Sequence, residues 1–274
     1  SNQGGGVHIS GDGVVTRCLI RNNGSRIGGG AYIENGTLRN SLILNNLSHY
    51  DPENPPGYFD VPSDGGGIFI QGRGNLENCT VLNNVSTHTT GGVFWEASFD
   101  PDDETVIRNN ILYANSGFNL PAEAYFVTLE HNCIQNGTRL TDGNISSDPQ
   151  VTADYRLSQS SPCRDTGTNQ AWMTGSGDYA GITRVVNSDV DMGALEFVAP
   201  LVITQIQHGD EQVTLNWTSS PGAVYQLEEA HDLSGNSWQN VGVAVTATGT
   251  ASSQTEAVSP GLRRFYRYRH VLFE

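Results

Sequence analysis

A pattern of alternating apolar and polar positions recurs four times in the N-terminal part of the chain. Each copy starts with small residues, mostly glycine, and reads GGGVHIS, GGGAYIE, GGGIFIQ and TGGVFWE. The copies begin at Gly4, Gly28, Gly65 and Thr90, so successive steps are 24, 37 and 25 residues. Alternation with a period of two over a few residues predicts short β-strands that bury one face.

A second apolar pattern follows each of these segments and ends in asparagine. It reads VTRCLIRNN, LRNSLILNN, LENCTVLNN, IRNNILYAN and LEHNCIQNG, with its first apolar residue at Val15, Leu38, Leu76, Ile107 and Leu129. The steps of 23, 38, 31 and 22 residues match the glycine steps, and no helical period lies between them. A repeat of this length built from short strands predicts an all-β parallel solenoid of about five coils.

The repeat register also predicts columns of side chains that run along the solenoid. The inward columns are Ile20, Ile43, Val81, Leu112 and Ile134; Val7, Ala31, Ile68 and Val93; and Ile9, Ile33, Ile70 and Trp95. A column of asparagines is expected at a repeated corner, comprising Asn23, Asn46, Asn84 and Asn115. There we expect left-handed backbone and amide hydrogen bonds between coils.

Two columns on the glycine-led strands should point outward, because side chains alternate across a strand. They are His8, Tyr32, Phe69 and Phe94, and beside them Ser10, Glu34, Gln71 and Glu96. Coils repeat at about 4.8 Å, comparable with the repeat of an extended polysaccharide, and aromatic faces beside hydrogen-bonding groups suit sugars. We therefore expect His8, Tyr32, Glu34, Phe69, Gln71, Phe94 and Glu96 to contact a ligand. The alternative, in which the rings cover one another and stabilise the solenoid, stays open.

Two insertions border the same face and should form the walls of a groove. Residues 47–64 contribute Tyr58, and residues 97–105 contribute Phe99, both expected to contact the ligand. Long loops on a regular scaffold commonly carry function. The second insertion also holds Asp100, Asp102 and Asp103, which are candidates for a calcium site because hard oxygens cluster there. No other cofactor is predicted.

The last part of the chain changes character. Segments such as EQVTLNWTSS and RRFYRYRHVLF alternate and are separated by turns, which predicts a small antiparallel β-sandwich with Trp217 and Tyr225 in its core. The predicted domains are 1–199 for the solenoid and its closing tail, and 200–274 for the sandwich.

Charge limits the classes of partner. The chain has 274 residues, 14 arginines, no lysine and 29 acidic residues, giving a net charge of −15. This charge disfavours nucleic acid, anionic membranes and polyanionic substrates, and a neutral partner fits better. No apolar run is long enough to span a membrane. Of the four cysteines, Cys133 and Cys163 are expected to meet where the tail folds back, and a disulfide between them stays open.

The repeat resembles the right-handed parallel β-helix family, the pectate-lyase-like superfold, over residues 4–197. The closing stretch from DPQVTADYRLSQSSPCRDTGTN to DMGALEF resembles the terminal segment of secreted bacterial β-helix proteins, which implies structural roles for Asp165, Asp191 and Glu196. The end of the chain resembles fibronectin-type-III-like modules. Together these features are similar to the β-helical binding modules of gut-bacterial xylanases, carbohydrate-binding module family 89. The resemblance implies a secreted bacterial, non-catalytic module that binds a xylan-like plant cell-wall polysaccharide and is linked to an upstream catalytic domain.

Two other functions stay open. A glycoside hydrolase or lyase would use the same face, with Glu34 and Glu96 as acid and base. Two coils separate these residues by about 9–10 Å, which is compatible with an inverting mechanism. Gln71 lies between them, and for a lyase only Arg73 near the end of this strand would serve as base. The third function is a surface adhesin or structural β-helix with neither activity nor affinity.

Overall fold

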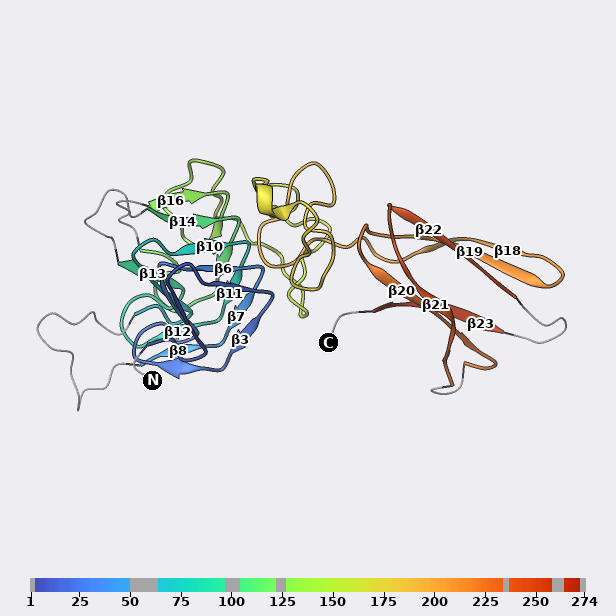
Figure 1. Ribbon diagram of the computed structural model, residues 1–274, viewed down its shortest axis with the longest axis horizontal. Coiled ribbons are helices and arrows are strands. Elements are labelled where there is room, and N and C mark those ends of the chain that lie inside the picture. The colour runs from blue at the N-terminus through green and yellow to red at the C-terminus, as the bar shows by residue number, and fades with distance from the viewer. Residues whose placement is uncertain are drawn as a thin grey trace, which may run out of the picture. The chain divides into compact units, whose positions relative to one another are not determined.

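The computed structural model describes residues 3–49, 64–96, 104–121, 127–233, 237–257 and 264–271 (Figure 1). The chain divides into two compact units. The first comprises Ser1–Ala171 and Asn187–Phe197, and the second comprises Trp172–Val186 and Val198–Glu274. The second unit thus includes 172–186, which the predicted first domain contains, and the boundary near Ala199–Pro200 stays a prediction. Within the described ranges, no helix has the length and apolar character needed to cross a bilayer.

The first unit is a parallel β-solenoid, as predicted. Its four sheets are ordered β1-β5-β9-β13, β16-β14-β10-β6-β2, β17-β15-β11-β7-β3 and β12-β8-β4. The first sheet comprises β1 (Val7–Ser10), β5 (Ala31–Glu34), β9 (Ile68–Gln71) and β13 (Val93–Glu96). The second comprises β2 (Val14–Thr16), β6 (Thr37–Arg39), β10 (Asn75–Glu77), β14 (Thr105–Arg108) and β16 (Val127–Glu130). Figure 1 shows β6, β10, β14 and β16 of this sheet as successive neighbours.

The other two sheets complete each coil. The third comprises β3 (Leu19–Arg21), β7 (Leu42–Leu44), β11 (Thr80–Leu82), β15 (Ile111–Tyr113) and β17 (Cys133–Ile134). The fourth comprises β4 (Gly24–Ser25), β8 (Leu47–Ser48) and β12 (Val85–Ser86). Every strand pair in these sheets is parallel, so each residue lies beside its equivalent in the next coil.

The aliphatic core confirms the predicted inward columns. One cluster contains Ile9, Ile20, Ala31, Ile33, Leu38, Ile43, Ile68, Ile70, Leu76, Val81, Val93, Trp95, Ile107, Leu112, Leu129 and Ile134, with Val7 packed against it. Trp95 is 5% exposed, so its indole points inward as expected. A core this continuous is what joins the short strands into one unit, because none of them buries enough surface alone.

The glycine runs have a steric cause. Gly28 has a φ of +62°, and a Cβ on Gly29 would lie 2.3 Å from the carbonyl oxygen of Gly66 in the next coil. The backbones of successive coils are therefore too close at this corner for a side chain. The repeated glycines are structural and place β1, β5, β9 and β13 in register.

The predicted asparagine column exists, but its backbone conformation differs from the prediction. The left-handed residues are the preceding ones, Asn22, Asn45, Asn83 and Ala114, with φ between 53° and 56°. The column residues follow this corner and turn their amides along the solenoid axis. Asn46, for example, accepts hydrogen bonds from Asn23 and donates to Asn84 at 2.9 Å. Asparagine is thus used for its side-chain hydrogen bonds, and the tight corner falls one residue earlier.

The closing tail folds back on the solenoid through backbone hydrogen bonds. Thr168 N donates to Asn109 Oδ1 at 2.8 Å, and Gly193 N donates to the carbonyl of Asn109 at 2.7 Å. Asp191 accepts a bond from Asp165 N at 2.7 Å, and its own N–H donates to Glu196. The carboxylates of Asp191 and Glu196 and the backbone N–H of Asp165 therefore connect segments of the tail, in agreement with the structural role that the resemblance implied.

All four cysteines are free thiols. Cys133 and Cys163 are both buried, and the Cys163 thiol hydrogen-bonds Cys133. This hydrogen bond and burial raise the pKa of the Cys163 thiol. The two residues meet as predicted, but in this structure both are free thiols and the disulfide that the sequence left open is not formed. Of the other two thiols, Cys18 is half-buried and Cys79 is buried.

The second unit contains a small antiparallel β-sandwich and most of a 3-10 turn, η1 (Ala171–Met173), whose first residue belongs to the first unit. One sheet is ordered β18-β19-β22 and the other β21-β20-β23. The strands are β18 (Ile203–His208), β19 (Gln212–Thr218), β20 (Val224–Ala230), β21 (Gln239–Thr246), β22 (Ala251–Ala257) and β23 (Phe265–Val271). Trp217 and Tyr225 are 0% and 1% exposed, which confirms them as core residues.

We expect Glu228 on β20 to make the sandwich sensitive to acid. Its buried carboxylate accepts hydrogen bonds from Arg267 Nε at 2.6 Å and Arg269 Nε at 3.1 Å. Burial raises the pKa of Glu228, but the two arginines lower it by more, so the net shift is downward from 4.5. A lowered folded-state pKa contributes stability above the unfolded-state value, and this contribution is lost as pH falls below about 4.5 through the folded-state pKa.

The measurement is amide hydrogen exchange of β20 and β23 in the whole chain, corrected for the intrinsic pH dependence. In the wild type, protection should decrease as the pH is lowered from 7 toward the lowered pKa of Glu228. In Glu228→Gln, protection should be lower at pH 7 and change less with pH. The matched control is Glu229→Gln, whose carboxylate pairs with one arginine, Arg264. Equal pH dependence in both variants would contradict the assignment.

Candidate functional site

A row of polar side chains crosses the sheet of glycine-led strands where the strands end. Ser10, Glu34, Gln71 and Glu96 are the last residues of β1, β5, β9 and β13, and each pairs in register with the next. Because strands in a sheet repeat at about 4.8 Å, Glu34 and Glu96 lie about 9–10 Å apart along this row. The structure thus brings together residues that are 62 positions apart in sequence, as predicted.

Hydrogen bonds hold this polar row in one arrangement. Tyr32 donates its phenolic O–H to Gln71 Oε1, and Gln71 Nε2 donates to Glu96 Oε2 at 3.0 Å. At the other end, His8 Nε2 lies 3.6 Å from Glu34 Oε2. The amide of Gln71 is therefore fixed between a donor and an acceptor. The remaining carboxylate oxygens of Glu34 and Glu96 are acceptors for a ligand.

The aromatic column forms a stack whose ring faces are largely covered, and this corrects a prediction. Tyr32 and Phe69 are 3% and 1% exposed. Their ring centroids lie 5.4 Å apart with the planes within 6°, and the Phe69 and Phe94 centroids lie 5.3 Å apart. With Ile27 they form a second cluster, separate from the aliphatic core. The expectation of open ring faces is thus wrong for Tyr32 and Phe69, because each face in the stack is used by its neighbour.

The buried position of Tyr32 fixes its protonation. Burial, and then the nearby carboxylates of Glu34 and Glu96, raise the pKa of Tyr32 to about 12. The phenol therefore keeps its proton across the physiological range and acts as a donor to Gln71. His8 packs edge-on against Tyr32 at 4.9 Å and is itself exposed. The face thus combines a buried aromatic layer with a polar edge.

The family model that matches the chain is the right handed beta helix region, over residues 1–152. The chain belongs to the right-handed β-helix family. No curated protein and no solved structure shows significant similarity to it. Family membership establishes the fold of the first unit. It is compatible with binding or degrading carbohydrate, because β-helices host unrelated functions on one scaffold.

Some predicted site residues of this β-helix lie outside the described residues. They are Tyr58, Phe99, Asp100, Asp102 and Asp103. Their proposed roles in ligand contact and calcium binding stay predictions. In the ranges that the structure does describe, no group of three or more His, Cys, Asp or Glu side chains is placed to hold a metal ion.

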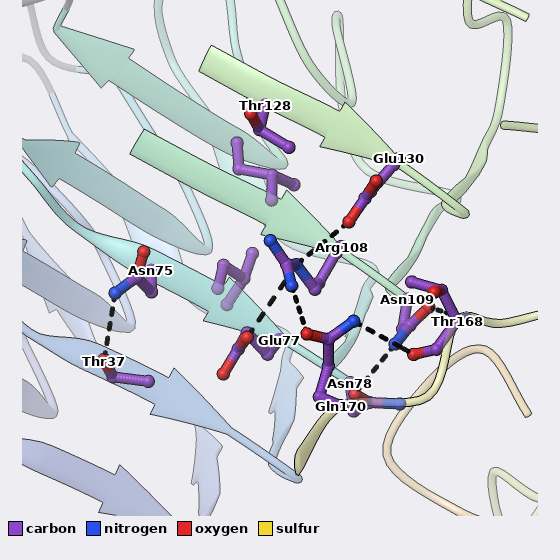
Figure 2. Close-up of polar contacts among 12 residues, drawn as sticks. Thr37, Asn75, Glu77, Asn78, Arg108, Asn109, Thr128, Glu130, Thr168 and Gln170 are labelled. Atoms are coloured by element: carbon purple, nitrogen blue, oxygen red, sulfur yellow. Dashed lines mark hydrogen bonds and ion pairs between the residues drawn. The ribbon is translucent and has the colours of Figure 1, made fainter. Parts of the chain in front are cut away.

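A charged row on the second β-helix sheet was missed by the sequence reasoning (Figure 2). Arg39, Glu77, Arg108 and Glu130 are the last residues of β6, β10, β14 and β16, and they alternate in sign along the sheet. The signal was present in the repeat, since each residue follows the first apolar residue of its LRN, LEN, IRN or LEH motif. Opposite charges on adjacent parallel strands stabilise the sheet.

Arg108 is the centre of this charged row. Its Nε lies 3.3 Å from Glu130 Oε1 and 3.9 Å from Glu77 Oε1, and its Nη1 donates to Gln170 Oε1 of the closing tail at 2.5 Å. Figure 2 shows Gln170 and Thr168 against this edge of the sheet, beside Asn109. The Arg108 side chain is only 18% exposed. We therefore assign Arg108 to docking of the tail, with Glu77 and Glu130 holding its guanidinium.

A second missed cluster lies at a β-helix corner. Asp64 is 2% exposed and accepts hydrogen bonds from Thr90 N at 2.8 Å, Thr89 N at 3.1 Å and the ring Nδ1 of His88 at 2.9 Å. These bonds cross from one coil to the next and fix the turn before β13. The carboxylate is fully used by this turn, so the cluster is structural.

Proposed function

We propose that the chain is a non-catalytic carbohydrate-binding module that holds a neutral or weakly charged polysaccharide along the β1-β5-β9-β13 face. The observation that supports this proposal is the in-register polar row of Glu34, Gln71 and Glu96, fixed by Tyr32 and by its own hydrogen bonds. Fixed acceptors lose little entropy when they bind a ligand. Sugar hydroxyls are donors, so they complement the free carboxylate oxygens.

The spacing and charge of the chain agree with this ligand class. Strands repeat at about 4.8 Å, which lets consecutive units of an extended chain meet equivalent positions. The net charge of −15 favours a neutral chain over a polyanion. A xylan-like plant cell-wall polysaccharide, secretion by a bacterium and a covalently linked catalytic domain upstream follow from the resemblance, and they are part of the proposal.

The covered aromatic stack changes how binding would work. Because Tyr32 and Phe69 are buried, the ligand would be recognised through hydrogen bonds to His8, Glu34, Gln71 and Glu96 rather than through ring stacking. Phe94 is the ring of the stack that retains partial exposure. Hydrogen bonds exchange with water and each contributes little net free energy. The proposed affinity therefore depends on several units of the chain binding together.

A second candidate is an inverting glycoside hydrolase that uses Glu34 and Glu96. Their separation of about 9–10 Å lies at the upper end of the range for that mechanism. A general acid in such enzymes is ordinarily shielded from water so that it retains its proton. The Glu34 side chain is 48% exposed, and Glu96 is engaged by Gln71. These observations favour the binding module.

The test is affinity electrophoresis of the whole chain in gels containing xylan, glucomannan, β-glucan or pectin. We expect retardation by at least one neutral polysaccharide. The double variant Glu34→Gln and Glu96→Gln should weaken binding by about 10- to 100-fold, because hydrogen bonds to charged groups contribute about 1.5–3 kcal/mol. The control is Glu211→Gln, which removes an exposed carboxylate from the second unit and should leave retardation unchanged.

Product assays run on the same samples separate the candidates. Retardation without new reducing ends or unsaturated products supports the module. Products that disappear in the double variant would instead identify the hydrolase or lyase and overturn the module. Neither retardation nor products on any of the four polysaccharides would favour a structural β-helix or an adhesin.

A further inference from the structure

A cavity of about 170 Å³ lies at the last coil of the β-helix, and no residue of the polar row lines it. Its lining comprises Gly117, Phe118, Asn119, Leu120, Pro121, Leu129, Ile134, Gln135, Asn136, Gly137, Thr138 and Arg139. Leu129 and Ile134 are the final residues of two aliphatic columns, so the cavity is bounded by the end of the core. It is smaller than the about 300–1,000 Å³ of drug-sized sites, which suits one small ring.

The charged side chain in the lining of this cavity is a cation. The lining contains Arg139 and no aspartate or glutamate, although the chain has twice as many acidic as basic residues. Gln135 Oε1 already accepts a hydrogen bond from Ala114 N at 2.7 Å. Its amide nitrogen is therefore the group that can donate to a ligand. Because this lining offers no carboxylate to the Arg139 guanidinium, the cavity favours an anionic ligand group that pairs with it.

The cavity also has an accessible aromatic ring. Phe118 is 57% exposed, and it is the one Phe, Tyr or Trp classed as exposed among the residues that the structure describes. Its backbone is held on both sides, since Phe118 N donates to Thr89 O at 2.9 Å and Gly92 N donates to Phe118 O at 3.2 Å. An exposed ring on a rigid backbone beside fixed donors matches the apolar C–H face and the polar edge of a sugar.

We propose that this cavity binds a single sugar ring that carries a carboxylate, as in a uronic acid. The carboxylate pairs with Arg139, Gln135 donates to a ring oxygen or hydroxyl, and Phe118 covers the apolar face. The net charge of −15 opposes an anion at long range, but this repulsion is screened beyond about 8 Å, whereas the contact with Arg139 is direct. The site is independent of the polar row, which presents acceptors instead of donors.

The experiment is calorimetric titration of the whole chain with three ligands. D-glucuronate carries both the ring and the carboxylate, glucose has the ring alone, and acetate has the carboxylate alone. We expect binding of glucuronate in the millimolar range, at least tenfold tighter than either partial ligand, because a charge-assisted bond is lost in one case and the ring contact in the other. Equal affinity for glucuronate and glucose, or for glucuronate and acetate, would overturn the proposal.

Variants locate the binding. Arg139→Gln should reduce the glucuronate affinity about tenfold or more and leave the weak glucose affinity unchanged. Phe118→Ala should weaken both sugars. Leu140→Ala is the matched control, because Leu140 is 53% exposed next to Arg139 but does not line the cavity. Circular dichroism confirms folding. Glucuronate binding that survives Arg139→Gln would refute the assignment.

The Glu34→Gln and Glu96→Gln variant separates this site from the proposed polysaccharide face. We expect it to bind glucuronate normally, and we expect Arg139→Gln to be retarded normally by neutral polysaccharide. If the chain binds no polysaccharide, the Arg139→Gln and Phe118→Ala variants still decide whether glucuronate binds at the cavity.

Discussion

Replacing Phe69 with alanine is expected to lower the free energy of unfolding of the β-helix by about 3–5 kcal/mol. Phe69 is the middle ring of the aromatic stack, 1% exposed, with Tyr32 on one face and Phe94 on the other. The substitution leaves a cavity where the ring was and removes two stacked pairs, each contributing about 0.5–1.5 kcal/mol. Chemical denaturation followed by circular dichroism measures the loss.

Two control variants separate the cost in stability of losing this buried ring from the cost of replacing any phenylalanine. Phe69→Leu keeps most of the buried volume and should destabilise by a smaller amount. Phe118→Ala removes an exposed ring and should change stability by less than about 1 kcal/mol. A Phe69→Ala variant as stable as Phe118→Ala would mean that the stack is not part of the packed interior. In that case the open aromatic track predicted from the sequence would return as an explanation for ligand binding.

The aromatic stack also shows where sequence reasoning ends. Period-two alternation determines that Tyr32 and Ile33 lie on opposite sides of β5, and both sides were assigned correctly, since Ile33 is in the aliphatic core and Tyr32 in the separate cluster. Alternation does not determine what covers each side. Tyr32 and Phe69 are both buried on the side that was expected to face the ligand, because contacts beyond their own strands decide exposure.

The contacts of the polar row likewise divide into those that the sequence predicted and those that it did not. The register that aligns Glu34, Gln71 and Glu96 was predicted from the repeat, because equal positions in successive coils must pair in a parallel solenoid. The direction of the Gln71 amide was not predicted, because it depends on a hydrogen bond from the Tyr32 hydroxyl. The contact of Arg108 with Gln170 likewise depends on the path of a tail with no repeat of its own.

The two proposed sites differ in chemistry because they occur at different places on the scaffold. The polar row lies on strands that repeat, so it offers the same kind of group several times and suits an extended chain. The cavity beside Phe118 lies where the columns end, so its groups occur once and suit a single ring. Their charges are opposite as well, with two carboxylates in the row and one guanidinium at the cavity.

A second large loss of stability is expected when the asparagine column is interrupted, because its amides connect successive coils. Asn84 is 0% exposed, and its Oδ1 accepts hydrogen bonds from the backbone N and the Nδ2 of Asn46, both at 2.9 Å. Its Nδ2 donates to Ile43 O at 2.9 Å and to Asn115 Oδ1 at 2.9 Å. One side chain therefore satisfies polar groups in three successive coils.

Asn84→Ala is expected to destabilise the β-helix by about 3–5 kcal/mol. The substitution leaves two buried donors on Asn46 and the carbonyl of Ile43 without their partner, and each unsatisfied group costs about 1–3 kcal/mol before water or local movement relieves it. The matched control is Asn75→Ala, because Asn75 is half-buried in the same unit and donates a single 3.3 Å bond to Thr37. It should cost less than about 1 kcal/mol.

Because each coil contacts only its neighbours, the damage should be local as well as global. Hydrogen exchange should accelerate first in β7, β11 and β15, the strands next to Asn46, Asn84 and Asn115. Exchange that rises equally in all coils would indicate that the solenoid opens as one cooperative unit. An unfolding free energy unchanged from wild type would contradict the role assigned to the column, since Asn84 Oδ1 accepts both bonds from Asn46.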